Sequence, residues 1–146
     1  MALRRDNNQY FGETQADIRD ELIRYSKLNG YVAEHFADAK CKCGSTQFEL
    51  VMDEDAGVAV RLCPSCGEEH GMGDSDDYAD EADLCIAECM CGGDRFEITV
   101  GVSLYVDSHD VRWLYVGCRC PACSLTGCYG DWKNEFNDYQ QLLANV

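Results

Sequence analysis

Apolar and polar residues alternate strictly from Phe96 to Val106, where every second position is apolar. The tetrapeptide DSHD at 107–110 then supplies turn residues, and the segment VRWLYVG at 111–117 is again largely apolar. An extended chain places successive side chains on opposite faces of a sheet. The pattern therefore predicts a long β-hairpin with one buried face.

A shorter pattern of the same kind precedes it at residues 47–62. The segment QFELVMD places Phe48, Leu50 and Met52 at alternating positions, EDAG supplies a turn, and VAVRL returns the chain. The sequence therefore predicts a second β-hairpin. Because two strands alone are marginally stable in water, we expect each hairpin to be fastened at its open end.

The chain before the hairpins carries the spacing of an amphipathic helix. A candidate capping pair, Thr14 with Asp17, precedes apolar residues one turn apart, Ile18 and Leu22. Gly30 follows at a position where helices commonly end. These residues predict a helix that begins near residue 14 and ends at residue 29.

Two further segments are predicted to be helical. Residues 31–39 place Val32 and Phe36 on one side of a helix. The final stretch, from residue 131, has an apolar stripe at helical spacing. Its members are Trp132, Phe136, Tyr139 and Leu143. We expect the first and last helices to pack on the hairpins and to enlarge their core.

The sequence contains an internal repeat. The phrase CKCGSTQFEL at 41–50 returns 48 residues later as CMCGGDRFEI at 89–98, and CPSC at 63–66 returns as CPAC at 120–123. A Gly-Asp pair begins seven residues after the last of these cysteines in both copies. Agreement in spacing at three places indicates a duplicated unit, and each unit opens and closes its hairpin with two cysteines.

The chain has eleven cysteines, and its N-terminal segment lacks the apolar stretch of a secretory signal. We therefore expect a cytoplasmic protein, in which paired cysteines at these spacings favour metal binding over disulfides. Zn²⁺ takes four thiolates in a tetrahedron, and Gly44, Gly67 and Gly92 permit the tight turns that bring two sulfurs to one ion. The predicted ligands are Cys41, Cys43, Cys63 and Cys66 for one Zn²⁺, and Cys89, Cys91, Cys120 and Cys123 for the other. The spacing leaves open whether each quartet lies within one copy or is exchanged between copies.

The motifs CKCG…CPSCG and CMCG…CPAC resemble the zinc-ribbon family over residues 41–131. The first cysteine pair of each copy is C-x-C, whereas most zinc ribbons have C-x-x-C, so Cys85 or Cys118 is an alternative ligand. The motif CPSCG also resembles the iron site of rubredoxin, which makes Fe the alternative occupant. The resemblance implies two structural Zn²⁺ ions and little about activity.

These observations predict a small, metal-stabilised α+β protein with two zinc-ribbon β-hairpin units flanked by N- and C-terminal helices. The expected parts are an N-terminal helical segment at 1–40, a first ribbon with an acidic connector at 41–84, a second ribbon at 85–131 and a C-terminal helix at 132–146. We expect the four parts to form one compact body. The three remaining cysteines, Cys85, Cys118 and Cys128, are expected to be small buried side chains, and His70 is either a spare ligand or a surface residue.

The net charge of −15 falls mainly on residues 41–88, which hold thirteen acidic and two basic residues. Such a chain repels nucleic acid phosphates and anionic lipid, and its natural partner is a basic protein. The connector DSDDYADEAD at 74–83 departs from a calcium loop, because Ala79 and Cys85 stand where glycine and glutamate are required. The residues predicted to contact the partner are Asp74, Asp76, Asp77, Asp80, Glu81 and Asp83.

The sequence therefore predicts a non-catalytic interaction protein, because it has no HExxH, GxSxG or P-loop motif. In size and acidity it resembles small bacterial immunity proteins and antitoxins, which implies a role in inhibiting a basic toxin. The alternatives are a zinc-ribbon adaptor in transcription or translation and a rubredoxin-like electron carrier. We expect no membrane span and no direct contact with nucleic acid.

Overall fold

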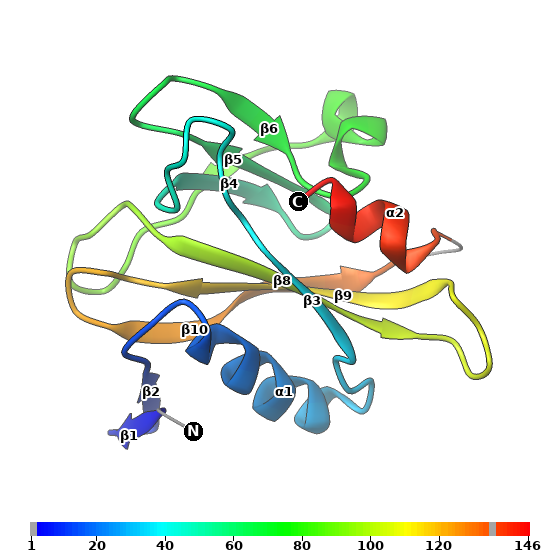
Figure 1. The fold of residues 1–146 in the computed structure, drawn as a ribbon, viewed down its shortest axis with the longest axis horizontal. Helices are drawn as coiled ribbons and strands as arrows, with labels where there is room; N and C mark the ends of the chain where they lie inside the picture. The colour runs from blue at the N-terminus through cyan, green and yellow to red at the C-terminus, as the bar shows by residue number, and fades with distance from the viewer. Residues whose placement is uncertain (1–2, 135–136) are drawn as a thin grey trace.

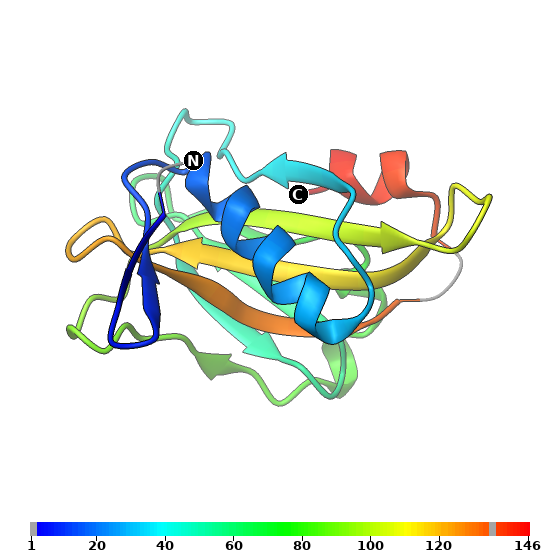
Figure 2. The same cartoon turned by 90° about the horizontal axis from the view of Figure 1, so that it is seen from below.

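A computed structural model describes residues 3–134 and 137–146 of the chain. It has three layers (Figure 1 and Figure 2): helix α1 (Asp17–Asn29), a six-stranded antiparallel sheet, and a four-stranded antiparallel sheet. The six-stranded sheet has the order β1 (Arg4–Asp6), β2 (Gln9–Phe11), β10 (Leu125–Lys133), β9 (Val111–Arg119), β8 (Glu97–Leu104) and β3 (His35–Asp38). The four-stranded sheet has the order β6 (Glu69–Gly71), β5 (Val58–Leu62), β4 (Glu49–Asp53) and β7 (Cys85–Ile86). The chain therefore has an α+β fold.

Both copies of the repeat fold as three-stranded meanders. In the first copy β4 pairs with β5 and β5 with β6, and in the second copy β8 pairs with β9 and β9 with β10. The alternating patterns at 47–62 and 96–117 thus correspond to real antiparallel hairpins. Two short 3₁₀ helices, η1 (Ser75–Asp77) and η2 (Ala79–Glu81), follow the first meander.

The two meanders meet at equivalent residues. Phe48 and Phe96, which are 48 positions apart in the sequence, form an antiparallel bridge in which each backbone N–H donates to the other's carbonyl at 2.8 Å. Both side chains are fully buried. A residue that pairs with its own counterpart lies on a local two-fold axis, so the duplicated units are related by an approximate two-fold rotation at this point.

The segment that leads into each copy pairs with the first strand of the other copy. Ahead of the first copy, β3 pairs with β8, with Ala37 opposite Val100. Ahead of the second copy, β7 pairs with β4, with Cys85 opposite Met52. Ala37 and Cys85 are 48 positions apart in the sequence, and so are Met52 and Val100. Each copy therefore completes the other copy's sheet, and the two meanders form one body.

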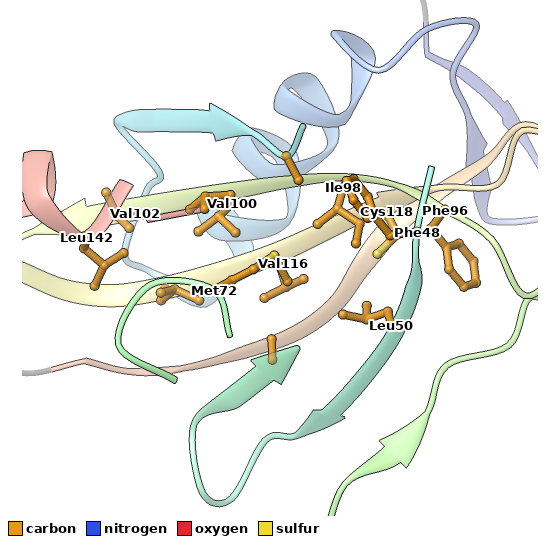
Figure 3. Close-up of a cluster of buried hydrophobic side chains, with 14 of the residues drawn as sticks. Phe48, Leu50, Met72, Phe96, Ile98, Val100, Val102, Val116, Cys118 and Leu142 are labelled. Atoms are coloured by element: carbon orange, nitrogen blue, oxygen red, sulfur yellow. The ribbon is translucent and has the colours of Figure 1, made fainter. Parts of the chain in front are cut away.

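The main core lies between the two sheets (Figure 3). Leu50 and Met72 of the first copy face Ile98, Val100 and Val116 of the second copy, and each of the five is at most 3 % exposed. Alternation along β8 and β9 supplies this inner face, as the pattern predicted. Helix α2 (Tyr139–Ala144) adds Leu142 to the same cluster.

A second core lies between α1 and the other face of the six-stranded sheet. Ile18 and Leu22 are fully buried there against Tyr115. The helix lies close to the sheet because β8 and β9 present Gly101 and Gly117 beneath it. A Cβ atom on Gly117 would lie 2.5 Å from Cγ2 of Ile18, which is well inside van der Waals contact. Glycine at this position therefore sets the distance between helix and sheet.

Helix α1 begins at Asp17, three residues later than the capping pattern predicted. The Asp17 carboxylate accepts hydrogen bonds from the backbone N–H groups of Glu13 and Thr14 at 2.8 and 2.9 Å. The contact between Thr14 and Asp17 is thus real, but it orders the turn before the helix. Gly30 ends the helix at a φ of 88°, as predicted.

Two helix predictions are wrong. Residues 35–38 form strand β3, because their backbone pairs with β8, a contact that local periodicity does not report. Trp132 lies in strand β10 opposite Leu114 of β9, and helix α2 begins only at Tyr139. Phe136, which was assigned to the same helical stripe, lies outside the described residues.

Candidate metal centres

The first cysteine pair of each copy lies in a tight turn of the same geometry. In the first copy the N–H of Gly44 donates to the carbonyl of Cys41 at 2.8 Å, and in the second the N–H of Gly92 donates to Cys89 at 2.8 Å. The two glycines have φ values of 98° and 92°. Residues with a side chain disfavour this left-handed conformation, which explains why glycine follows each C-x-C pair.

The second cysteine pair also repeats its geometry. The N–H of Gly67 donates to Cys63 O at 2.8 Å, and the N–H of Ser124 donates to Cys120 O at 2.7 Å. Gly67 has a φ of 79°, and Ser124 adopts a φ of 71° at the equivalent position. The second copy thus keeps the turn without its glycine.

The strands bring these turns together into two clusters. One contains the sulfur atoms of Cys41, Cys43, Cys63 and Cys66, and the other contains those of Cys89, Cys91, Cys120 and Cys123. Within each cluster all four sulfur atoms lie within 4.8 Å of one another. Each cluster draws its cysteines from one copy. The alternative in which quartets are exchanged between copies is therefore not the arrangement in this structure.

The separations of the sulfur atoms fit a tetrahedral ion. Four sulfurs at roughly 2.3 Å from a central metal lie about 3.8 Å from one another. Two of the sulfur–sulfur distances in the first cluster are 3.5 Å for Cys41–Cys66 and 3.6 Å for Cys43–Cys63. In the second cluster they are 3.5 Å for Cys89–Cys123 and 3.7 Å for Cys91–Cys120. A disulfide requires about 2.05 Å, so the clusters suit a metal ion and not S–S bonds.

Backbone N–H groups in the turns point at the sulfurs and lower the pKa of some thiols. The backbone of Gly93 donates to Cys91 and, with the neighbouring thiols, lowers its pKa to about 7. Burial raises the pKa of Cys63, but hydrogen bonds from the backbone of Cys66 and Ser65 outweigh it and bring the pKa to about 6. These donors stabilise thiolate, the form that binds metal.

Other thiols in the same clusters hold their protons. A hydrogen bond from the backbone N–H of Glu68 favours the thiolate of Cys66. The neighbouring thiols, led by Cys41, and burial have the larger effect and raise the pKa of Cys66 to about 12. Burial is the main reason that the pKa of Cys89 rises to about 12. A divalent ion must displace these protons, and its charge supplies the attraction that lets four thiolates coexist.

A closed set of four cysteines leaves no coordination position for water or substrate. Tetrahedral sites of this composition hold Zn²⁺ or Fe and serve mainly to stabilise structure or to carry electrons. In each cluster the first cysteine of each pair is buried and faces the core, including Cys41 and Cys120 at 2 % and 0 % exposure. The clusters therefore link the open ends of the hairpins to the main core, as the sequence suggested.

The three remaining cysteines occupy different environments. Cys118 is fully buried in the main core, and burial raises its pKa well above the usual value. Cys128 is half-buried near α1, where burial again raises the pKa of the thiol. Cys85 is exposed, because β7 is an edge strand, so its predicted burial is wrong. None of the three belongs to either cluster.

His70 does not complete a metal site in this structure. Its Nε2 atom lies 2.9 Å from the carbonyl oxygen of Asn145, and the ring thereby links β6 to the end of α2. The rings of His35 and His109 both stack with Tyr139, with centroids 4.1 and 5.9 Å from the tyrosine ring. The histidines thus contribute to packing around α2.

The acidic residues predicted to bind a partner do not all lie on one free surface. Asp74 accepts hydrogen bonds from the side chains of Asn134 and Asn137 at 2.9 and 2.8 Å, so its carboxylate is bound within the protein. The N–H of Asp83 donates to the carboxylate of Asp53 at 2.9 Å. The remaining members, Asp76, Asp77, Asp80 and Glu81, are exposed on η1 and η2.

The fold adds acidic residues that the sequence reasoning missed. Asp53 at the end of β4, together with Glu54 and Asp55 in the turn that follows, lines an open groove of about 490 Å³ that also includes Asp83 and Glu88. We call this feature the acidic groove. The letters DED at 53–55 were visible in the sequence, but their position beside residues 83–88 depends on the pairing of β7 with β4.

Comparisons with protein-family models, curated proteins and solved structures gave no match. In the described part of the chain, no helix has the length and apolar character needed to cross a membrane.

Proposed function

We propose that each cysteine quartet holds one structural Zn²⁺ and that the protein is a non-catalytic interaction protein whose acidic face binds a basic partner. The closed, all-thiolate clusters support a structural role for the metal, because a catalytic zinc keeps an open position and usually has histidine or carboxylate ligands. Two ions held at the open ends of the meanders then add their binding free energy to that of folding.

The observation that carries the binding role is the acidic groove. Five carboxylates line it, and no lysine or arginine is among its lining residues. Among residues 3–134 and 137–146, the ion pairs within 4.0 Å involve other acidic residues, so these five have no cationic partner at that distance. A basic protein would neutralise this charge and would be steered toward it from a distance.

An inhibitor of a basic toxin, as in immunity proteins and antitoxins, is the form of this role that best fits the chain's size and its net charge of −15. A fast, charge-steered association is what such an inhibitor requires. The toxin would present a cluster of lysine and arginine side chains to the groove.

A capture experiment from the native cell, with nuclease treatment, tests the proposal. The bait is the tagged protein, compared with a triple variant at exposed groove residues, Glu54→Lys, Asp55→Lys and Glu88→Lys. A matched control makes the same charge change at exposed acidic residues elsewhere, Glu13→Lys, Glu34→Lys and Asp94→Lys.

We expect one stoichiometric basic protein that is retained by the wild type and the control, lost from the groove variant, and released by high salt. Ribosomal or polymerase subunits bound equally by all three baits would instead indicate an adaptor. A red protein that bleaches on reduction would indicate iron and electron transfer. Either of these results would overturn the proposal.

A further inference from the structure

The acidic groove contains an open sheet edge. Strand β7 is the last strand of the four-stranded sheet and, among the residues that the structure describes, pairs with β4 alone. The N–H of Ala87 donates to Leu50 O at 2.8 Å, so this residue faces β4. Because antiparallel pairing alternates along a strand, the N–H and C=O of Ile86 face outward. Ile86 is 61 % exposed and is one of the residues that line the groove.

The equivalent edge in the other copy carries side chains that contact helices of the same chain. Strand β3 has the same place in the six-stranded sheet, and Asp38 stands where β7 has Ile86. Asp38 pairs with Arg19 of α1 at 3.3 Å, and His35 stacks on Tyr139 of α2 at 4.1 Å. The β3 edge thus carries an ion-paired carboxylate at the position where the β7 edge has the apolar Ile86.

An unpaired sheet edge with exposed apolar residues can pair with a strand of another chain, and proteins usually carry features that prevent such pairing. Here the groove beside the edge combines an apolar part with its carboxylates. Met52, Ala87 and the ring of Tyr129 line it together with Ile86. An added strand would place successive side chains on opposite faces of the sheet, so its apolar residues could meet Ile86 on one face while its basic residues meet the carboxylates on the groove face.

We propose that the β7 edge binds an extended basic segment of the partner, in which lysine or arginine alternates with apolar residues, as an added β-strand. This inference rests on the proposed function and assigns the part of the acidic face at which the partner docks. The backbone of Ile86 supplies the hydrogen bonds, and the carboxylates of Glu54, Asp55 and Glu88 select the charge of the segment.

The test uses a fluorescein-labelled peptide of eight alternating arginine and valine residues, measured by fluorescence anisotropy at low salt with the full-length protein. Two comparison peptides replace arginine with glutamate, or the central valine with proline, which removes a donor for strand pairing. The protein variants are Ile86→Lys and Ile86→Pro, and Val106→Lys is the matched control at an 85 % exposed apolar position outside the groove.

We expect the arginine–valine peptide to bind the wild type and Val106→Lys equally and to bind both Ile86 variants at least tenfold more weakly. The proline peptide should bind at least tenfold more weakly than its parent, and the glutamate peptide should not bind. Hydrogen exchange at the Ile86 amide should slow when the peptide is bound. Circular dichroism spectra that match the wild type would show that the variants are folded.

The outcome separates this inference from the proposed function. Loss of binding in the triple variant at Glu54, Asp55 and Glu88, with full binding in Ile86→Pro, would mean that the acidic face attracts basic chains without strand addition. That result overturns the inference and leaves the proposed function standing. Equal binding of the parent and proline peptides would have the same meaning, and no binding of any basic peptide or protein would overturn both.

Discussion

Replacing Gly117 with alanine tests how α1 is seated on the sheet. The added Cβ would lie 2.5 Å from Cγ2 of Ile18 and 2.9 Å from Cδ2 of Leu22. Carbon atoms prefer separations of about 3.5–4.0 Å, so the helix must move outward by roughly 1 Å. Both side chains are fully buried, and the shift disturbs the whole second core.

Overpacking of this kind costs about 1–3 kcal/mol of unfolding free energy. For a chain of 146 residues this corresponds to a decrease in Tm of about 3–12 °C. The control is Gly127→Ala on the neighbouring strand, where the nearest atom to the new Cβ is Cε1 of Tyr129 at 3.9 Å. This control should be neutral or slightly stabilising, because alanine restricts the unfolded chain.

Thermal and urea unfolding of the two variants measure the difference. In a double-mutant cycle with Ile18→Ala, the two substitutions together should lower the unfolding free energy by less than the sum of their separate effects. The difference should be at least about 0.5 kcal/mol, because removing Cγ2 of Ile18 relieves the closest contact. An unchanged Tm in Gly117→Ala, or strict additivity in the cycle, would refute the argument that this glycine sets the spacing between helix and sheet.

Three further outcomes are expected. Cys66→Ser should lower metal content from two ions to one and decrease Tm, whereas the exposed Cys85→Ser should retain both, as measured by elemental analysis. Hydrogen bonds from the backbone of Asp83 and Ala56 lower the pKa of Asp53. The ionised carboxylate therefore stabilises the fold above about pH 4, and this stabilisation is lost as the pH falls through the lowered pKa. The urea midpoints of Asp53→Asn and wild type should differ at pH 7 and converge in acid. Tyr115→Phe should cost about 1–3 kcal/mol in urea unfolding, because the hydroxyl of the fully buried Tyr115 donates to the carbonyl of Tyr31 at 2.6 Å; an unchanged midpoint would contradict this.

The parts of the fold that follow from local chemistry could be predicted from the sequence. Strict alternation from residue 96 onward identified the hairpin of β8 and β9, and the glycines after the cysteine pairs identified the turns. The quartets were predicted because each copy opens with C-x-C and closes with C-x-x-C, although the sequence left open an exchange of quartets between the copies. In each of these cases the interaction partners lie on the same strand, turn or repeat.

The parts that depend on pairing across the duplication could not be predicted. His35–Asp38 has no alternation of its own and becomes a strand only because the lead-in segment of one copy pairs with the other copy. The position of Trp132 in β10 likewise follows from pairing with β9. The acidic groove was missed for the same reason, because it joins a hairpin turn to the distant strand β7.

One short element was missed although the sequence signals it. Asn7 and Asn8 have φ values of 51° and 64°, and they connect β1 to β2 in a two-residue turn. Asparagine is among the residues that tolerate positive φ at both positions of such a turn. Two adjacent asparagines between short segments with apolar residues therefore favour a hairpin at the N-terminus.

The most direct test of the account is the metal content of the protein purified without added metal and without chelator, by elemental analysis together with native mass spectrometry. We expect two Zn²⁺ ions per chain, a mass that includes both ions, and loss of the folded spectrum when a strong chelator removes them. A chain that is folded and fully stable without metal, or one that carries iron at both sites, would contradict it.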